Sequence, residues 1–226
     1  MLRNHGTKVN RKTVRKVLKD NNLSLPASKH RGRTKSRNLF KPIKPDQLWE
    51  TYITYIPIEF GMTYLMCIRD TFTEEWQGYH YSRSCTARDA IGSLENAVLM
   101  AFNGTVPEGL ALRTDNGPHY ISDIFKNTVK TLGIKSEYIQ KHTPEDNWDI
   151  ESFHNSLKTD YIWVNDIERF EDAKKLMEYA FTDYNTVRSH SSIDYLPPRK
   201  FRRKFLNDPG FRERFEKKEV EVRLNE

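Results

Sequence analysis

The 226-residue sequence predicts a mixed α/β fold with a five-stranded sheet, preceded by a strongly basic N-terminal arm. Two observations predict the sheet: three β-rich segments follow one another across short turns, and strands then alternate with amphipathic helices. A third observation concerns charge, because Lys and Arg are concentrated in the first 44 residues. This length suits one domain of ordinary size with an appendage.

The first half of the predicted sheet is an antiparallel meander. Segments 48–56, 62–68 and 75–82 are dense in β-branched and aromatic residues, which favour strands. Turns containing Pro57 with Gly61, and Asp70 with Thr73, separate them. We expect the later elements in this order: a helix at 87–101, a strand at 110–114, a helix at 124–132, a strand at 134–139, and helices at 147–161 and 167–186. The last forty residues contain Pro-Pro and Pro-Gly pairs and predict turns with a loosely packed terminal helix.

The arm is the most charged part of the chain. Residues 1–44 contain fourteen Lys or Arg against one acidic residue, Asp20, so the rest of the chain is net acidic although the whole carries +6. This distribution predicts a polyanion partner, and a solubilising basic tail is the alternative. The expected domains are an arm at 1–45, consisting of a short basic helix and a linker, a core at 46–205 and a C-terminal tail at 206–226.

Composition excludes several classes of protein. The sequence has no apolar run long enough for a membrane span and no apolar stretch typical of a signal peptide. Cys67 and Cys85 are its two cysteines, and their spacing fits neither a disulfide framework nor a zinc site. We therefore expect a reduced cytoplasmic location.

Two carboxylates carry the predicted chemistry. Asp115 directly follows a short buried strand, and Glu151 lies in the first turns of a predicted helix. Hard oxygen ligands of this kind suit Mg²⁺ or Mn²⁺. Taken singly, Asp115-Asn-Gly117 is typical of a turn and a helical Glu is usually solvated. The two carboxylates are separated by 35 residues.

The chain resembles insertion-sequence transposases that share the ribonuclease-H-like core of retroviral integrases. The resemblance covers about residues 9–201. It rests on the Asp115 to Glu151 interval and on these motifs: Trp49-x-Thr-x-Ile-Thr-Tyr-Ile-Pro57, Asp115-Asn-Gly, Pro144-Glu-Asp-Asn147, Ile150-Glu-Ser-Phe-His154 with Leu157-Lys158, and Tyr184-Asn-x-x-Arg188-x-His190 with Tyr195 and Pro197-Pro198.

This resemblance implies a function on double-stranded DNA. Family members bind two metal ions, Mg²⁺ or Mn²⁺, and cut and join DNA by in-line attack on a phosphodiester. It implies that Asp115 and Glu151 are metal ligands, that Asn155 and Lys158 contact DNA, and that Arg188 and His190 contact a phosphate or a core partner. It also implies a homo-oligomer on DNA, associated with the nucleoid. The DNA-binding candidates in the arm are Arg11, Lys12, Arg15, Lys16, Arg31 and Arg33.

The chain departs from the family at its first catalytic position. The family strand reads Trp-x-Thr-Asp-Ile-Thr-Tyr, whereas this chain has Tyr52 in place of the aspartate that bridges the ions. A neutral phenol is a poor ligand for hard cations. Glu50 and Asp70 are the alternative ligands, and an aspartate restored at position 52 is expected to restore cleavage.

These departures leave the enzymatic status open. The leading interpretation is a transposase impaired in catalysis; the alternatives are a non-enzymatic DNA-binding protein derived from a transposase and a nuclease acting on RNA–DNA hybrids. Family members also carry helix-turn-helix modules before the core, and the basic arm is interpreted as the remnant of such a module.

The arm should provide most of the DNA affinity. We expect deletion of residues 1–44 to flatten the plot of log K against log salt concentration, because each phosphate neutralised contributes a slope of about −0.9. Fluorescence anisotropy with labelled duplex DNA at several salt concentrations measures this. An unchanged slope in the truncated chain would show that the arm is not the electrostatic contact.

Overall fold

The computed structural model describes residues 11–21, 23, 40–139 and 148–224, and it divides the chain into two units, residues 1–37 and 38–226. The first unit contains the basic helix α1 (Arg11–Asp20), on which Lys12, Arg15 and Lys16 are exposed. No helix among the described residues is both long and apolar enough to span a membrane.

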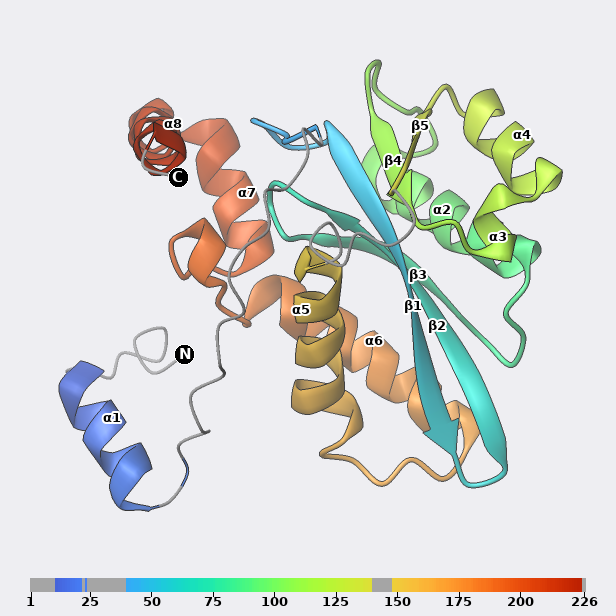
Figure 1. Ribbon diagram of the computed structural model, residues 1–226, viewed down its shortest axis with the longest axis horizontal. Coiled ribbons are helices and arrows are strands. Elements are labelled where there is room, and N and C mark those ends of the chain that lie inside the picture. Colours follow the sequence, from blue (N-terminus) through green and yellow to red (C-terminus); the bar gives the residue numbers. More distant parts are fainter. Residues whose placement is uncertain (1–10, 22, 24–39, 140–147, 225–226) are drawn as a thin grey trace. The chain divides into compact units, whose positions relative to one another are not determined.

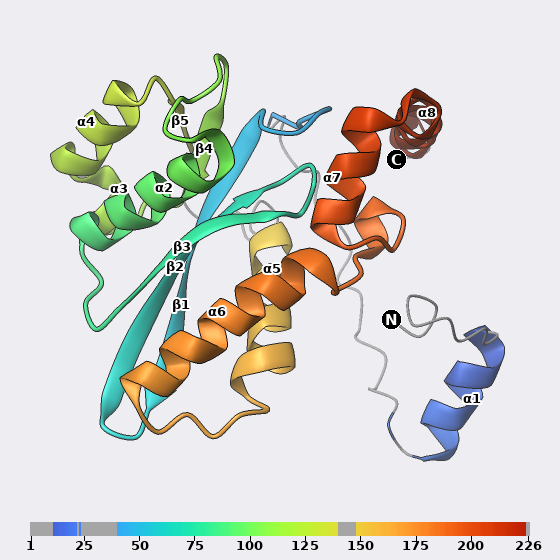
Figure 2. The same cartoon turned by 180° about the vertical axis from the view of Figure 1, so that it is seen from behind.

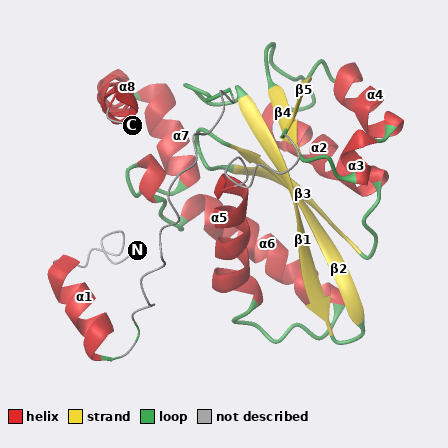
Figure 3. Cartoon of the chain, in the orientation of Figure 1, coloured by secondary structure: helices red, strands yellow, loops and turns green. Residues whose placement is uncertain are grey.

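The second unit is built on a five-stranded sheet with the strand order β3-β2-β1-β4-β5 (Figures 1 and 3). Its strands are β1 (Leu48–Ile58), β2 (Gly61–Asp70), β3 (Trp76–Ser82), β4 (Ala111–Thr114) and β5 (Lys135–Tyr138). The first three strands are antiparallel neighbours, and β4 and β5 run parallel to β1. The sequence-based prediction of a three-stranded meander followed by two further strands is confirmed.

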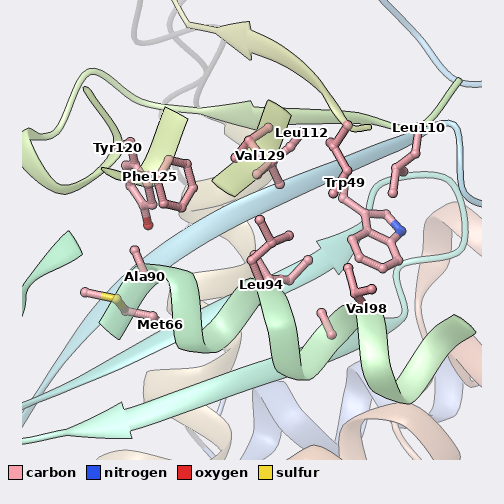
Figure 4. Packing of buried hydrophobic residues seen from close by; sticks show 13 residues of the cluster. Trp49, Met66, Ala90, Leu94, Val98, Leu110, Leu112, Tyr120, Phe125 and Val129 are labelled. Carbon is pink, nitrogen blue, oxygen red and sulfur yellow. The ribbon is translucent and has the colours of Figure 1, made fainter. Parts of the chain in front are cut away.

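Helices cover both faces of the sheet, as the two opposite views show (Figures 1 and 2). One face packs against α2 (Ala87–Phe102), α3 (Pro118–Ile121) and α4 (Asp123–Thr131). Figure 4 shows this core, with Trp49 beside Val98 and Met66 beside Ala90. The other face packs against α5 (Trp148–Leu157), the π-helical turn η3 (Lys158–Ile162) and α6 (Phe170–Thr186).

Alternation along the strands assigns side chains to the two faces. Trp49 and Ile68 belong to the core under α2, whereas Tyr52, Ile56 and Cys67 belong to the core under α5 and α6. A shift of one residue would exchange these sets, so burial on both faces fixes the register of the central strands.

The C-terminal region is more ordered than its prolines predict. In place of turns and a loosely packed helix, the structure has α7 (Pro198–Asn207) and α8 (Pro209–Leu224) in succession. Pro198 is tolerated because it stands at the first helical position, where its missing N–H is not needed. A third cluster holds the two helices together through phenylalanine rings: Phe72, Phe201, Phe205, Phe211 and Phe215.

Asn185 ties α6 to the beginning of the edge strand β3. Its side-chain oxygen accepts a hydrogen bond from the Trp76 N–H at 2.9 Å, and its side-chain nitrogen donates to the Trp76 carbonyl at 2.8 Å. Asn185 is fully buried. The amide thus takes the place of a neighbouring strand for one residue of β3.

We expect Asn185→Ala to lower the free energy of unfolding by about 2–3 kcal/mol, because it leaves the buried Trp76 N–H and carbonyl without partners. Urea unfolding monitored by circular dichroism measures the change. Asn207→Ala, at an exposed position of α7, is the control and should change stability by less than about 0.5 kcal/mol. Equal effects of the two substitutions would contradict the bridging role.

Candidate active site

The candidate site comprises Tyr52, Asp115 and Glu151; Tyr52 lies on β1, and Asp115 directly follows β4, the parallel neighbour of β1. β1 and β4 are parallel neighbours, with Glu50 opposite Arg113. Tyr52 follows Glu50 by two residues on the same face, and Asp115 follows Arg113 by two residues, directly after β4. The last paired residues of the two strands, Glu50 and Arg113, thus stand two residues before Tyr52 and Asp115.

Asp115 begins the turn that leads from β4 into α3. Its side chain is exposed, and its Oδ1 accepts a hydrogen bond from the Gly117 N–H at 2.7 Å. A Cβ atom at position 117 would lie 2.7 Å from that oxygen, so a larger residue there would displace the carboxylate. The Asp-Asn-Gly turn and an exposed carboxylate thus occur together, and the turn holds the carboxylate at the end of β4.

Helix α5 carries the other predicted positions. The Glu151 backbone is helical, but its side chain lies outside the described residues, so its predicted approach to Asp115 stays a prediction. Phe153 and Leu157 are buried against the sheet, as the helical periodicity predicts. Asn155 is exposed, and Lys158, the first residue of η3, is half-buried.

The Tyr52 hydroxyl bridges a buried ion pair. It donates to Glu50 Oε2 at 2.6 Å and accepts from Arg69 Nε at 3.0 Å. Arg69 Nη2 lies 3.4 Å from the same carboxylate oxygen, and the two charged residues face each other across β1 and β2. The exposed fractions of Tyr52, Glu50 and Arg69 are 2%, 2% and 3%.

Further charged groups complete this arrangement, which we call the buried ion network (Tyr52, Glu50, Arg69, Glu74, Arg113 and Glu137). Arg113 Nη1 donates to Glu50 Oε1 at 2.8 Å, and its Nη2 lies 3.2 Å from Glu137 Oε1. Arg69 Nη1 pairs with Glu74. Both oxygens of Glu50 and all three side-chain nitrogens of Arg69 therefore have partners.

Aromatic rings enclose the network on the side of α5. The Tyr52 and Phe153 ring centroids are 5.1 Å apart, and the Arg69 guanidinium carbon lies 5.4 Å and 5.6 Å from them. Next to this stack, Thr54 Oγ1 and His154 Nδ1 are 2.6 Å apart. Burial, together with the positive charges of Lys158 and Arg69, lowers the pKa of His154 to about 4.

The described residues do not fit a two-ion site. Burial raises the pKa of the Tyr52 phenol well above its usual value, Arg69 opposes this shift and Glu50 adds to it, so the ligand form, a phenolate, is disfavoured. Glu50 already accepts from two guanidinium groups. Asp70 is fully buried and accepts from the backbone of Asp46, Phe72 and Thr73.

Neither alternative ligand named from the sequence is therefore free to bind an ion. Within the described ranges, no three His, Cys, Asp or Glu residues form a group that could hold a metal ion. Asp115 and Glu151 are the residues whose chemistry suits one.

Arg188 and His190 make contacts within the core. Arg188 donates to Asp160 Oδ2 and to Ser156 Oγ, each at 2.8 Å. His190 is 9% exposed, and its ring lies edge-on to Tyr184 at 4.7 Å. Burial lowers the pKa of His190 to about 3, helped by the charge of Arg188 and Arg69. These contacts favour the core-partner interpretation, while a DNA contact stays a prediction.

The N-terminal candidates belong to the other unit. Lys12, Arg15 and Lys16 are exposed on α1, the side chain of Arg11 is not described, and Arg31 and Arg33 lie outside the described residues. Their contact with DNA stays a prediction.

Sequence analysis missed Arg69, Glu74, Arg113 and Glu137. A signal was present, because Glu50 and Arg69 are charged residues within strands whose neighbours are largely apolar. Antiparallel pairing of the two predicted strands places opposite charges face to face.

Two stretches of the chain, residues 42–144 and 132–198, match the family described as "Integrase core domain". The chain is 31% identical to the transposase for insertion sequence element IS904 of Lactococcus lactis over 215 residues, covering 89% of this chain and 83% of that protein. It is 29% identical to the transposase InsF for insertion sequence IS3A of Escherichia coli, covering 91% and 75%.

Solved structures share the fold at low identity. A simian T-cell lymphotropic virus intasome chain superposes with a TM-score of 0.63 at 19% identity, covering 76% of this chain and 59% of that chain. The HTLV-2 integrase catalytic core domain, solved in complex with magnesium, superposes with a TM-score of 0.50 at 16% identity, covering 72% and 99%. The fold is therefore the ribonuclease-H-like integrase core. With the identity and coverage shared with the curated relatives, the chain belongs to the insertion-sequence transposases that carry an integrase core domain.

Proposed function

We propose that this chain is a DNA transposase core whose metal-assisted cutting and joining of DNA is impaired because Tyr52 replaces the first catalytic aspartate. The observation that carries the proposal is the buried ion network: the phenol at this position is hydrogen-bonded to Glu50 and Arg69, and both oxygens of Glu50 are already paired with guanidinium groups. In this proposal Asp115 and Glu151 are the ligands of a weakly bound Mg²⁺ or Mn²⁺ ion. DNA is the substrate because the chain belongs to a transposase family and carries a basic arm.

The loss should be large for a physical reason. Two divalent ions held about 4 Å apart repel each other, and a carboxylate between them offsets the repulsion and fixes their separation. Positioning and electrostatic stabilisation account for most of phosphoryl-transfer catalysis. Each 1.36 kcal/mol of lost transition-state stabilisation slows the reaction tenfold, so losing several kcal/mol means a deficit of about a thousandfold or more.

DNA binding should survive this loss. The arm attracts phosphates without base recognition, and Asn155 and Lys158 at the end of α5 are the core residues proposed to contact DNA. The proposal includes a homo-oligomer on DNA, because joining two element ends to a target requires more than one core. Arg188 then supports α5 through Ser156 and η3 through Asp160, and His190 packs on Tyr184 of α6.

A non-enzymatic DNA-binding protein is the second candidate, favoured by the partners that the polar side-chain atoms of Tyr52, Glu50 and Arg69 already have. Strand transfer with pre-cut ends separates the two candidates, since it bypasses the first cleavage. Joining that is abolished by Asp115→Asn supports an impaired enzyme. Absence of joining, with DNA binding intact, supports the binding protein.

We expect the unmodified chain to nick supercoiled plasmid DNA in Mn²⁺ no faster than Asp115→Asn/Glu151→Gln, because Tyr52 already removes the bridging charge. Anisotropy with duplex DNA should show similar binding by both proteins, and circular dichroism verifies that they are folded. Metal-dependent nicking by the unmodified chain that disappears in Asp115→Asn would contradict the impairment.

A further inference from the structure

The buried ion network places a charged group on the face of β1 that carries Tyr52. The network contains a permanent cation, because the Arg69 guanidinium stays charged under all ordinary conditions. That cation lies beside the Tyr52 ring and beside Phe153 of α5, the helix that also carries Glu151. A positive group is therefore already present between β1 and α5.

We propose that Arg69, which pairs with Glu50 and Tyr52 in this chain, is a built-in cation that excludes a divalent ion from position 52. It also excludes the ion when an aspartate is restored at that position. The inference rests on the proposed function, since it concerns the metal side of the same site. It changes the expectation from sequence alone, in which Tyr52→Asp is sufficient.

Replacing Tyr52 by aspartate changes the hydrogen-bond partners of Arg69. In Tyr52→Asp, Arg69 Nε loses the hydroxyl that accepts from it at 3.0 Å. A buried guanidinium nitrogen without an acceptor is unfavourable. Residues diagonally opposite on adjacent strands are within reach of long side chains, so Arg69 is able to follow the new carboxylate and pair with it.

The charge of Arg69 also opposes the binding of a divalent cation beside position 52. An aspartate paired with a guanidinium uses its oxygens to accept hydrogen bonds from that partner, and a divalent cation placed beside it also meets the repulsion of Arg69. Glu50 offers no substitute, because Arg113 Nη1 occupies its other oxygen at 2.8 Å. Removing the guanidinium releases both carboxylates on this face from Arg69.

The space left by the Tyr52 ring also favours Arg69. Replacing the phenol by aspartate removes a ring that packs on Phe153 at 5.1 Å, and the flexible Arg69 side chain is the nearest group able to enter. Methionine at position 69 keeps an unbranched chain of similar length without the charge. Lysine keeps the charge without the guanidinium fork, which makes it the matched control.

The experiment is a Mn²⁺ titration without DNA. Isothermal calorimetry and electron paramagnetic resonance of free Mn²⁺ measure the affinity. We expect Tyr52→Asp to bind Mn²⁺ within about twofold of the unmodified chain. Tyr52→Asp/Arg69→Met should bind at least about tenfold more tightly, and Tyr52→Asp/Arg69→Lys should resemble Tyr52→Asp. Adding Asp115→Asn to the Met variant should remove the gain, because the restored site needs both carboxylates.

Two outcomes overturn the proposal: a tenfold or larger gain in Tyr52→Asp alone, or a folded Tyr52→Asp/Arg69→Met without any gain. Circular dichroism verifies folding, and Arg69→Gln replaces Arg69→Met if the latter does not fold. If neither double variant folds, the affinity of Tyr52→Asp alone decides. Because no DNA is present, failure here is distinct from failure of the proposed impairment, which the nicking assay tests.

Discussion

The central strand pair depends on one buried carboxylate, Glu50, held between Arg69 and Arg113. Burying an ion is unfavourable unless good geometry and further hydrogen bonds compensate, and removing one partner of a buried pair costs about 3–5 kcal/mol. Here the compensation comes from three strands at once, since Glu50 lies on β1, Arg69 on β2 and Arg113 on β4. The network therefore couples the antiparallel and parallel halves of the sheet at β1, beside the candidate site.

The same constraint explains how β1 accommodates a tyrosine. A buried phenol needs an acceptor for its proton and room for its ring. Glu50 supplies the acceptor and Phe153 the packing surface. A tyrosine at this position would lack the acceptor if residue 50 were apolar, so the fit of Tyr52 depends on its charged neighbours rather than on the strand alone.

Most of the fold could be predicted from the sequence because local patterns determine it. The alternation in β1 and β2, and the apolar periodicity of α2 and α6, indicate elements and buried faces directly. Of the two terminal helices, only one loosely packed helix was predicted, because Pro198 and Pro209 are typical of turns and Phe72, which completes their core, is distant in sequence.

The candidate site was predictable only in part. The place of Tyr52 within a strand and that of Asp115 directly after a strand follow from local patterns. The role of Arg69 depends instead on cross-strand pairing that no local pattern contains.

The cross-strand pairing of Arg69 affects how Tyr52 should be interpreted. Sequence comparison treats position 52 as an isolated exchange of a ligand for a non-ligand, which reversal would correct. The structure instead shows a site whose polar atoms are mutually satisfied: the phenol, the Glu50 carboxylate and the Arg69 guanidinium each complete the hydrogen bonding of the others. In such a network the effects of single substitutions are not additive, because each change leaves its partners unpaired. The chemistry of position 52 is therefore a property of the group, and Arg69 determines it as much as Tyr52 does.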